Sequence, residues 1–361
     1  MDEAPALARA SHQDQTDHPR CYGALDLGTN NCRLLIATPA RGGFRVVEAF
    51  SRIVRLGEGL TLTGRLQDPA MDRAIAALQI CAEKLKRRRV MRLRAVATQA
   101  CRSAENGAEF ISRVERETGL KLSIIGPEEE ARLSVAGCSN LLDREAEAAL
   151  VVDVGGGSTE LSWVAFNGEE GDRRPRLIAW LSVPIGVVTL AERFPEPEPA
   201  TEEWWKSMVE AVRREIAAFG AADPLRGHFL DGRAHMVGTS GAITSLAGMH
   251  LGLQRYDRTR VDGLWMTRDE CRAAADRLRA VGRVGRAAEP CIGPERADLV
   301  LAGAAILEAV QQLWPCQRVR VADRGLREGM LLALMREGEG RARRRRRRRR
   351  SNGSGALAAP A

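Results

Sequence analysis

The segment Val151–Leu161 constrains the fold of this chain more than any other stretch. A run of apolar residues ends at Asp153, three glycines follow, and a Ser-Thr-Glu triplet ending at Glu160 leads into a second run in which apolar residues recur. This pattern predicts a β-hairpin with a glycine turn between its strands. Because glycine turns tightly and lets backbone N–H groups approach an anion closely, the turn is suited to a phosphate group.

The acid at the end of the first strand indicates a metal ion. Asp153 would lie beside a bound phosphate, where two negative charges repel each other unless a cation lies between them. Carboxylates and phosphate oxygens are ligands that Mg²⁺ takes, so the segment predicts a magnesium and phosphate site. The alternative is a plain hairpin with a flexible glycine tip, although such a hairpin needs neither three glycines nor flanking acids.

The same arrangement occurs once more, near the beginning of the chain. An apolar run ends at Asp26, and Gly28, Thr29 and Asn30 follow before apolar residues resume. Two such turns predict two similar halves that face each other across a cleft. A third strand–turn–helix element, Gly238–Gly241, suits a phosphate or the edge of a nucleotide, or else is only a tight turn.

Two further candidates lie at a predicted junction between a strand and a helix. Thr98 ends the apolar run 93–98, and Arg102 follows at the start of helical sequence. Helix N-termini attract anions, and arginine offers a forked donor to phosphate oxygens. The alternative for Arg102 is a surface ion pair.

Glu130 is the candidate for an acid–base role. It is the third of three acids at the start of a helix predicted after Gly126-Pro127, where acids are favourable partners of the helix dipole. The residues that follow suggest that the helix becomes buried, and a carboxyl group at that edge would have a raised pKa suited to a general base.

Length and composition bound the class of protein. A chain of 361 residues can form two domains, and its alternating strand and helix patterns predict an α/β fold. No apolar run is long enough to span a membrane, and the polar residues 1–20 do not form a signal peptide. The eight cysteines are scattered without metal-binding spacing, which is typical of a reducing compartment. We therefore expect a cytoplasmic protein.

The net charge of +8 belongs to one segment. Nine arginines lie within residues 341–350, which contain no acid, and without them the charge is −1. A basic face for nucleic acid on the folded part is therefore not expected. The run Arg343–Arg350 is either a passive disordered tail or a tether for polyanions such as polyphosphate or RNA.

Taken together, these motifs resemble those of the exopolyphosphatase/guanosine-pentaphosphate phosphohydrolase family, within the superfamily of actin and the sugar kinases. The matching stretches occur in family order: Asp26-Leu27-Gly28-Thr29-Asn30, Ala97-Thr98 with Arg102, Glu129-Glu130-Ala131-Arg132-Leu133, Asp153 to Glu160, Gly238 to Gly241, and Asp323 to Gly329. The resemblance implies two ribonuclease-H-like (actin-like ATPase) domains with mixed sheets flanked by helices and a cleft between them. We expect a disordered segment 1–19, domains at 20–146 and 147–338 with the last helix packed back on the first domain, and a basic disordered tail at 339–361.

The resemblance also assigns roles. Glu130 matches the catalytic base that activates water, and Asp26, Asp153 and Glu160 match acids of the catalytic centre, for which we expect a bound Mg²⁺ or another divalent cation. The predicted phosphate-binding residues are Gly28, Thr29, Asn30, Arg33, Thr98, Arg102, Gly155, Gly156, Gly157, Ser158, Thr159, Gly238, Ser240 and Gly241. One departure is that the family's Ser-Asn-Ser is here Thr29-Asn30-Asn31, so an amide replaces a hydroxyl. Another is that the chain has no room for the C-terminal helical domain of longer members.

These features predict an exopolyphosphatase that releases terminal orthophosphate from inorganic polyphosphate, as a homodimer. Guanosine pentaphosphate (pppGpp) is the alternative substrate, because it also presents a terminal phosphoryl group on an anionic chain. The same motifs would also suit a kinase or ATPase on this fold, or a phosphate or nucleotide sensor without catalysis.

Overall fold

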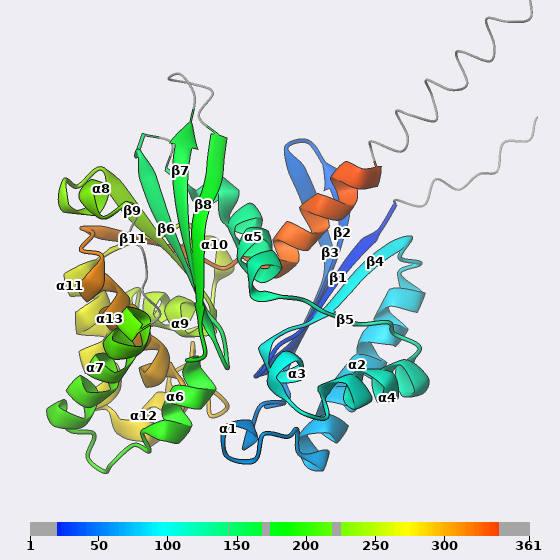
Figure 1. Ribbon diagram of the computed structural model, residues 1–361, viewed down its shortest axis with the longest axis horizontal. Helices are drawn as coiled ribbons and strands as arrows, with labels where there is room; N and C mark the ends of the chain where they lie inside the picture. Colours follow the sequence, from blue (N-terminus) through cyan, green and yellow to red (C-terminus); the bar gives the residue numbers. More distant parts are fainter. Residues whose placement is uncertain (1–19, 144, 168–173, 219–224, 339–361) are drawn as a thin grey trace, which may run out of the picture.

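The chain folds into two lobes, each built around a mixed β-sheet (Figure 1). This is a computed structural model, and it describes residues 20–143, 145–167, 174–218 and 225–338. The strands of the first lobe are β1 (Tyr22–Leu27), β2 (Asn31–Ala40), β3 (Gly43–Ile53), β4 (Arg92–Ala97) and β5 (Ser123–Ile124). Those of the second are β6 (Ala148–Val154), β7 (Thr159–Asn167), β8 (Arg174–Val183), β9 (Ala234–Thr239), β10 (Trp265–Thr267) and β11 (Arg318–Ala322). The predicted α/β class with two mixed sheets is confirmed.

The two sheets repeat one topology. The strand order is β3-β2-β1-β4-β5 in the first and β10-β11-β9-β6-β7-β8 in the second. In each, a central strand (β1 or β6) pairs antiparallel with the next strand of the chain and parallel with a later one on its other side. The two halves that the repeated acidic turns predicted are therefore present as two equivalent sheets.

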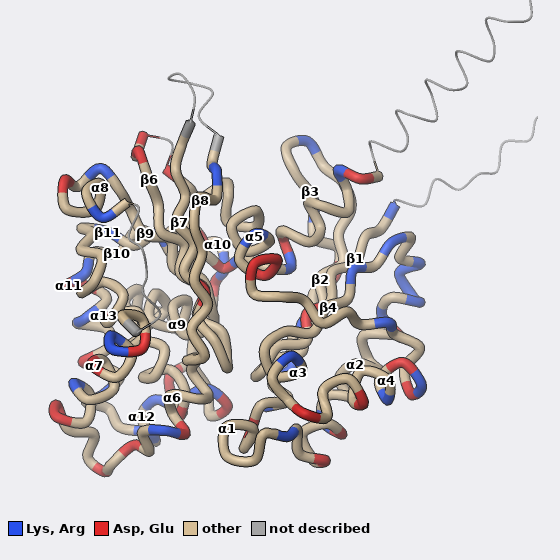
Figure 2. Tube along the Cα trace, in the orientation of Figure 1, with Lys and Arg blue, Asp and Glu red and all other residues tan. Residues whose placement is uncertain are grey.

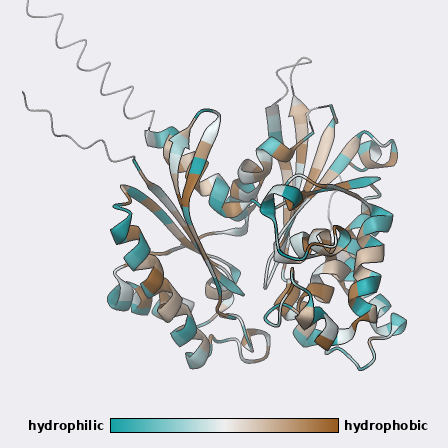
Figure 3. Cartoon of the chain, turned by 180° about the vertical axis from the view of Figure 1, so that it is seen from behind, coloured by the Kyte–Doolittle hydropathy of each residue, from teal (hydrophilic) through white to brown (hydrophobic). Residues whose placement is uncertain are grey.

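The helices flank the two sheets, most of them on the outer faces. They are α1 (Leu60–Thr63), α2 (Asp68–Arg87), α3 (Gln99–Ser103), α4 (Gly107–Thr118), α5 (Pro127–Cys138), α6 (Val187–Arg193), α7 (Glu202–Ala218), α8 (Arg226–Leu230), α9 (Gly241–His250), α10 (Arg258–Val261), α11 (Arg268–Ala280), α12 (Gly282–Ala288) and α13 (Val300–Leu313), with a 3-10 turn at Ser139–Leu141. Buried side chains of α2 and α4 join the outer core of the first lobe, and those of α7, α9, α11 and α13 join that of the second. Figure 3 shows the resulting division, with apolar residues on strands and inner helix faces and polar residues on the outer helices.

A pair of helical segments, α5 and residues 326–338, lies between the two sheets (Figure 1). Residues 326–338 contribute Met330 and Leu334 to a core shared with the inner face of the first sheet, while Val135 of α5 packs against the second sheet. The two segments meet at backbone distance, because a Cβ on Gly329 would lie 2.0 Å from the carbonyl oxygen of Leu133. Residues 326–338, the last that the structure describes, thus pack on the first lobe.

Figure 2 shows acidic and basic residues interspersed along the trace of both lobes. All eight cysteines are free and buried. Among the described residues, no helix has both the length and the apolar character needed to cross a bilayer. The segments predicted to be disordered, 1–19 and 339–361, lie outside the described residues, so those predictions stay open.

Candidate active site

The alternation of side chains along the strands places one acid of each lobe at the centre of the molecule. Alternate residues of a strand point to opposite faces. On β1, Ala24 belongs to the inner core, and Asp26 follows two residues later on the same face. On β6, Val151 belongs to the inner core and Asp153 follows in the same way. Both carboxylates therefore lie at the carboxyl ends of the central strands and face the gap between the sheets.

The cross-strand partners of the two acids carry opposite charges. Asp26 lies opposite Arg33 across the β1–β2 ladder, whereas Asp153 lies opposite Glu160 across the β6–β7 ladder. The equivalent positions of the two halves thus hold a cation in one lobe and a second carboxylate in the other. The second lobe brings excess negative charge to the site, and the first brings an arginine to face it.

The two glycine turns are built alike and touch each other. Each is closed by one backbone hydrogen bond of 2.9 Å, from Gly28 N to Asn31 O and from Gly155 N to Ser158 O. A Cβ on Gly156 would lie only 3.0 Å from the backbone nitrogen of Asn30 in the other lobe. A side chain here would press on the first turn, so the three-glycine sequence serves contact between the lobes as well as access for an anion.

A cavity of about 530 Å³ opens between these turns and is lined by both lobes. Fifteen of the predicted site residues line it, namely Asp26, Gly28, Thr29, Asn30, Arg33, Thr98, Glu130, Asp153, Gly155, Gly156, Gly157, Ser158, Glu160, Ser240 and Gly241. The structure therefore gathers into one cavity residues that are far apart in the sequence.

Three predicted phosphate-binding residues lie outside this lining. The Thr159 hydroxyl is buried and donates to Ile185 O at 2.6 Å, so it supports the neighbouring loop. Gly238 lies inside β9, where a Cβ would meet Ile243 at 2.9 Å, so its role is helix-on-sheet packing. Arg102 donates to Glu130 Oε2 at 3.2 Å and to Ile125 O at 2.7 Å. These three residues make contacts beside the cavity and are not part of its lining, and their phosphate-binding roles stay predictions.

Glu130 occupies the first turn of α5 and is only 8% exposed. Burial raises the pKa of its carboxyl group well above the ordinary value, and the nearby Glu160 raises it further, while Arg102 opposes both effects. A carboxyl group held this way exchanges its proton closer to neutral pH than a free glutamate does, which suits a general base.

The other carboxyl groups share this environment. Burial raises the pKa of Asp26 to about 6 and that of Glu160 to about 7, and it also raises the pKa of Asp153. Arg33 acts against the shift at both aspartates. Clustered acids with raised pKa values are typical of functional sites.

A divalent cation fits this cluster. The cavity lining carries more acids than arginines, an arrangement that would repel an anionic substrate without a cation. Asp26 Oδ1 is buried and has no hydrogen-bond partner. In Asp153, Oδ2 accepts from Ser134 at 2.5 Å, and the other carboxylate oxygen remains for a cation. Mg²⁺ commonly takes one or two carboxylates and completes its shell with water and substrate phosphate, so Asp26 and Asp153 fit it.

Two observations limit the protein's own contribution to such a site. Glu160 Oε1 already accepts from Ser158 at 2.7 Å and from Ser182 at 3.0 Å, which makes Glu160 a poorer ligand than the two aspartates. Within the described ranges, no group of three or more His, Cys, Asp or Glu is placed to hold a metal ion. A cation here would therefore depend on oxygens of the substrate.

The third predicted turn closes the far wall of the cavity. Ser240 caps α9, accepting from Ile243 N at 3.3 Å, and its φ of 148° lies in a region that favours glycine. Arg33 reaches across from the first lobe, and a Cβ on Gly241 would lie 3.7 Å from its Nη2. The start of α9 and Arg33 thus offer donors to the same part of the cavity.

Several lining residues were assigned no role from the sequence. Gln99 accepts from Thr29 Oγ1 at 3.0 Å. It also packs on Gly157 of the other lobe, where a Cβ would lie 2.0 Å from Gln99 Oε1. Arg327 lies close enough to Asp26 to lower the pKa of that carboxyl group. Arg327 lies in the stretch Asp323 to Gly329, which the family resemblance indicated without assigning a role to its residues. No sequence pattern indicated Gln99.

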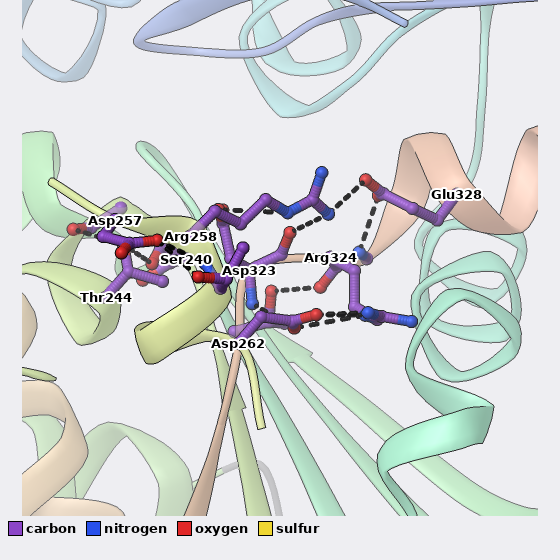
Figure 4. Close-up of polar contacts among 12 residues, drawn as sticks. Ser240, Thr244, Asp257, Arg258, Asp262, Asp323, Arg324 and Glu328 are labelled. Atoms are coloured by element: carbon purple, nitrogen blue, oxygen red, sulfur yellow. Dashed lines mark hydrogen bonds and ion pairs between the residues drawn. The ribbon is translucent and has the colours of Figure 1, made fainter. Parts of the chain in front are cut away.

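Figure 4 shows how the turn at Asp323 is fixed. Arg258 donates to Asp323 O at 2.6 Å, and Arg324 forms an ion pair with Asp262. Glu328, which is buried, accepts from Gly325 N at 2.9 Å. These contacts fix the place where the chain leaves the second sheet for the helical segment that packs on the first, beside the cavity.

Two equivalent sheets, closed over one cavity that an acidic glycine turn of each lobe lines, define a protein of the actin-like ATPase fold. The model of the Ppx/GppA phosphatase family matches residues 35–337. The chain belongs to this family, and the resemblance inferred from its motifs is confirmed.

Solved structures agree. The crystal structure of an Aquifex aeolicus member of the Ppx/GppA family is 30% identical, with a TM-score of 0.71 over 88% of this chain and 98% of that one. An exopolyphosphatase-like protein is also 30% identical, with a TM-score of 0.77 over the same shares of the two chains. An exopolyphosphatase from Cytophaga hutchinsonii, 24% identical with a TM-score of 0.77 over 88% of this chain and 98% of that one, supports the fold alone.

Proposed function

We propose that this phosphatase-family protein is an exopolyphosphatase that releases terminal orthophosphate from inorganic polyphosphate with the help of a divalent cation. One observation carries the proposal: the acidic turns of the two lobes meet around a cavity into which the buried Glu130 also faces. Cleavage of a phosphoanhydride bond requires charge neutralisation and alignment more than covalent chemistry, and the cavity provides groups for both.

The residues divide the work as follows. The amides of the two glycine turns, Arg33 and the start of α9 bind the terminal phosphoryl group. Asp26 and Asp153 hold Mg²⁺, which supplies neutralisation of the phosphate charge when bound. Glu130 takes a proton from the attacking water, and Arg102 orients its carboxylate through Oε2.

Glu130→Gln provides the direct test, because the amide keeps the shape of the side chain and removes the base. We expect orthophosphate release from tripolyphosphate with Mg²⁺ to fall by about 10²–10⁴-fold while substrate binding is kept. Glu129→Gln is the matched control, since Glu129 pairs with Arg94 and lies outside the cavity lining. A loss below about tenfold in Glu130→Gln would remove Glu130 from the role of base.

Guanosine pentaphosphate is the second candidate substrate. Besides the groups suited to phosphate, the cavity lining includes the side chains of Tyr256, Ile292, Leu299 and Val300. Aromatic and aliphatic side chains of this kind can pack on a nucleoside, which a bare phosphate chain lacks. Parallel assays of both substrates with the same enzyme distinguish them by kcat/KM. Formation of ADP from ATP with an acceptor would indicate a kinase, and binding without turnover would indicate a sensor.

The run Arg343–Arg350 lies outside the described residues, and its proposed role is to tether long polyanions by counterion release. Removing residues 341–361 should then raise KM for long polyphosphate at low salt and leave KM for tripolyphosphate unchanged. Equal KM values on long chains before and after truncation would mean that the run is passive. Sedimentation equilibrium of the full chain tests the expected homodimer.

A further inference from the structure

A loop after β3, residues 54–59, supports the first glycine turn from behind. Arg55 N donates to Asn30 O at 3.1 Å, and Gly57 N donates to Thr29 O at 2.9 Å. We call residues 54–59 the first bracing loop. Because its amides hold the carbonyl groups of the turn, a displacement of this loop is passed directly to Thr29 and Asn30.

The second lobe supports its own glycine turn in the equivalent way. Val187 N donates to Gly155 O at 3.0 Å, and Val188 N donates to Gly156 O at 2.8 Å, both from the start of α6. We call residues 186–192 the second bracing segment. It follows β8, as the first bracing loop follows β3, so the support is part of the repeated topology.

The first bracing loop contacts the second lobe at two places. Gly59 N donates to Glu192 Oε1 at 3.1 Å, which joins the two bracing segments to each other. Arg55 forms an ion pair with Asp298, Nη1 to Oδ2 at 3.0 Å, and its Nη2 also donates to Glu295 O at 3.3 Å. The guanidinium group therefore holds a carboxylate and a main-chain carbonyl of the opposite lobe at once.

The backbone of Arg55 is strained. Its φ is 47°, in the left-handed region that costs an L-residue free energy and favours glycine. The hydrogen bonds and the ion pair that its guanidinium group forms with described residues all lie on the second lobe. A strained residue retained for a contact between lobes points to a functional role.

Neither partner of the pair touches the substrate cavity. Arg55 and Asp298 line a separate space of about 920 Å³ between the lobes, which meets the substrate cavity at Asn30 and Leu299. An effect of the pair on catalysis therefore acts through its neighbours: the opposite lobe, including Glu295 of the cavity lining, and the first glycine turn.

We propose that Arg55 and Asp298 form a latch that holds the two lobes closed, and that Arg55 is a positioning residue for the first phosphate-binding turn. With the latch closed, Asp26 and Asp153 face the same phosphoryl group. With it open, the two acids separate and the turn at Thr29 loses its fixed place. The consequence for catalysis rests on the proposed function, whereas the closure itself does not.

Small-angle X-ray scattering of the full chain, without substrate, tests the closure. Asp298→Arg places a second cation against Arg55, and we expect a larger radius of gyration and a scattering curve that departs from that of the closed structure. The exchanged pair Arg55→Asp/Asp298→Arg should return the curve towards the wild type. Arg65→Glu is the control, because Arg65 pairs with Glu105 inside the first lobe and both are more than half exposed.

Circular dichroism establishes that each variant is folded, and Asp298→Asn, which keeps the shape of the side chain, serves if Asp298→Arg does not fold. An unchanged radius of gyration in the folded single variants, or an opening that the exchanged pair does not reverse, would overturn the latch. The same opening in Arg65→Glu would show a general charge effect and would overturn it as well.

The activity arm uses tripolyphosphate and Mg²⁺. We expect Arg55→Gln and Asp298→Asn each to lower kcat/KM by about two- to fivefold at low salt, as suits a partly exposed ion pair, and the loss to shrink at 1 M salt. An opened scattering curve with unchanged kcat/KM would overturn the positioning role. If the wild-type enzyme hydrolyses no tripolyphosphate, the proposed function fails, while the scattering result still decides the latch.

Discussion

At the scale of single residues, the chemistry depends on carboxyl groups whose surroundings change their proton affinity. Burial and the charge of Glu160 raise the pKa of Glu130, and the charges of Asp26 and Asp153 raise it by smaller amounts. Arg102 acts in the opposite direction and lowers this pKa. The sequence indicated Glu130, Asp26 and Asp153, because each has a local signal: a helix start or a glycine turn. It did not indicate the contact of Arg102 with Glu130, because that contact joins two helices and leaves no local pattern.

The opposing effects on the pKa of Glu130 predict how activity depends on pH. A base must be deprotonated, so activity falls on the acidic side as Glu130 gains its proton, at a higher pH than for a free glutamate. Arg102→Gln removes the cation that holds this pKa down, and the acidic limb of the kcat profile should move to higher pH. Arg94→Gln, which removes the partner of Glu129 on the same helix turn, should leave the limb in place. A limb that stays fixed in Arg102→Gln, or moves equally in both, would contradict this assignment.

Strain at Ser240 predicts opposite effects on stability and activity. Its φ of 148° costs a non-glycine residue roughly 1–3 kcal/mol, whereas replacing a serine cap by glycine costs only a few tenths. Ser240→Gly should therefore raise the thermal midpoint by about 2–4 °C and lower phosphate release, because a hydroxyl is lost from the cavity. Arg89→Gly is the control: Arg89 has a φ of 49°, is exposed and lies away from the site, so activity should not change. A fall in midpoint in Ser240→Gly would show that the hydroxyl outweighs the strain.

At the scale of elements, the long strands and helices were predictable, and the short ones were not. The hairpins β1–β2 and β6–β7 followed from apolar runs interrupted by glycine turns, and the start of α5 from the three acids after Gly126-Pro127. The elements α8, α10, α12 and β10 have three to seven residues, too few for a hydrophobic period to appear. Their positions are set by tertiary contacts and caps, as with α10, whose start is fixed by Asp257 accepting from Thr259 N at 2.9 Å.

One contact between elements predicts how stability depends on pH. Glu48 on β3 accepts from Lys84 at 2.7 Å and from Arg88 at 2.6 Å at the end of α2, and these hydrogen bonds lower the pKa of Glu48 to about 2. A lowered folded-state pKa gives stability that is present above the unfolded value near 4.5 and is lost as the pH falls towards 2. Arg87 also forms an ion pair with Glu48, so three residues of the basic run 84–89 bind this one carboxylate.

Glu48→Gln should lower the unfolding free energy by about 1 kcal/mol at pH 7, and the difference from wild type should shrink below pH 4. Thermal unfolding between pH 3 and 7 measures this. Glu105→Gln removes a more exposed single ion pair and should change stability by less than about 0.5 kcal/mol. A Glu48→Gln effect that is independent of pH would mean that the stabilisation comes from packing and not from charge.

At the scale of the whole molecule, the repeat that the two acidic turns indicated extends to the hydrogen bonds. Both turns are closed by the same bond and supported by the segment after the third strand of their sheet. The contacts between the halves had no sequence signal, because the pairs Arg55–Asp298 and Gln99–Gly157 join residues that are distant along the chain. The motifs thus predicted what each half contains, and only the structure shows how the halves meet.

The meeting of the two turns predicts the effect of adding one methyl group. A Cβ on Gly156 would lie 3.0 Å from Asn30 N and 3.0 Å from Thr29 Cβ, so the first turn would have to give way slightly. Gly156→Ala should therefore displace the first turn and lower phosphate release by about tenfold or more, since small misplacements of catalytic groups have large effects on rate. Gly227→Ala, where a Cβ meets nothing within 4 Å, is the matched control and should keep full activity. Because the methyl group acts on the spacing of the turns and not on any charge, added salt should not restore the activity. Activity within twofold of wild type would mean that the turns need not touch for catalysis.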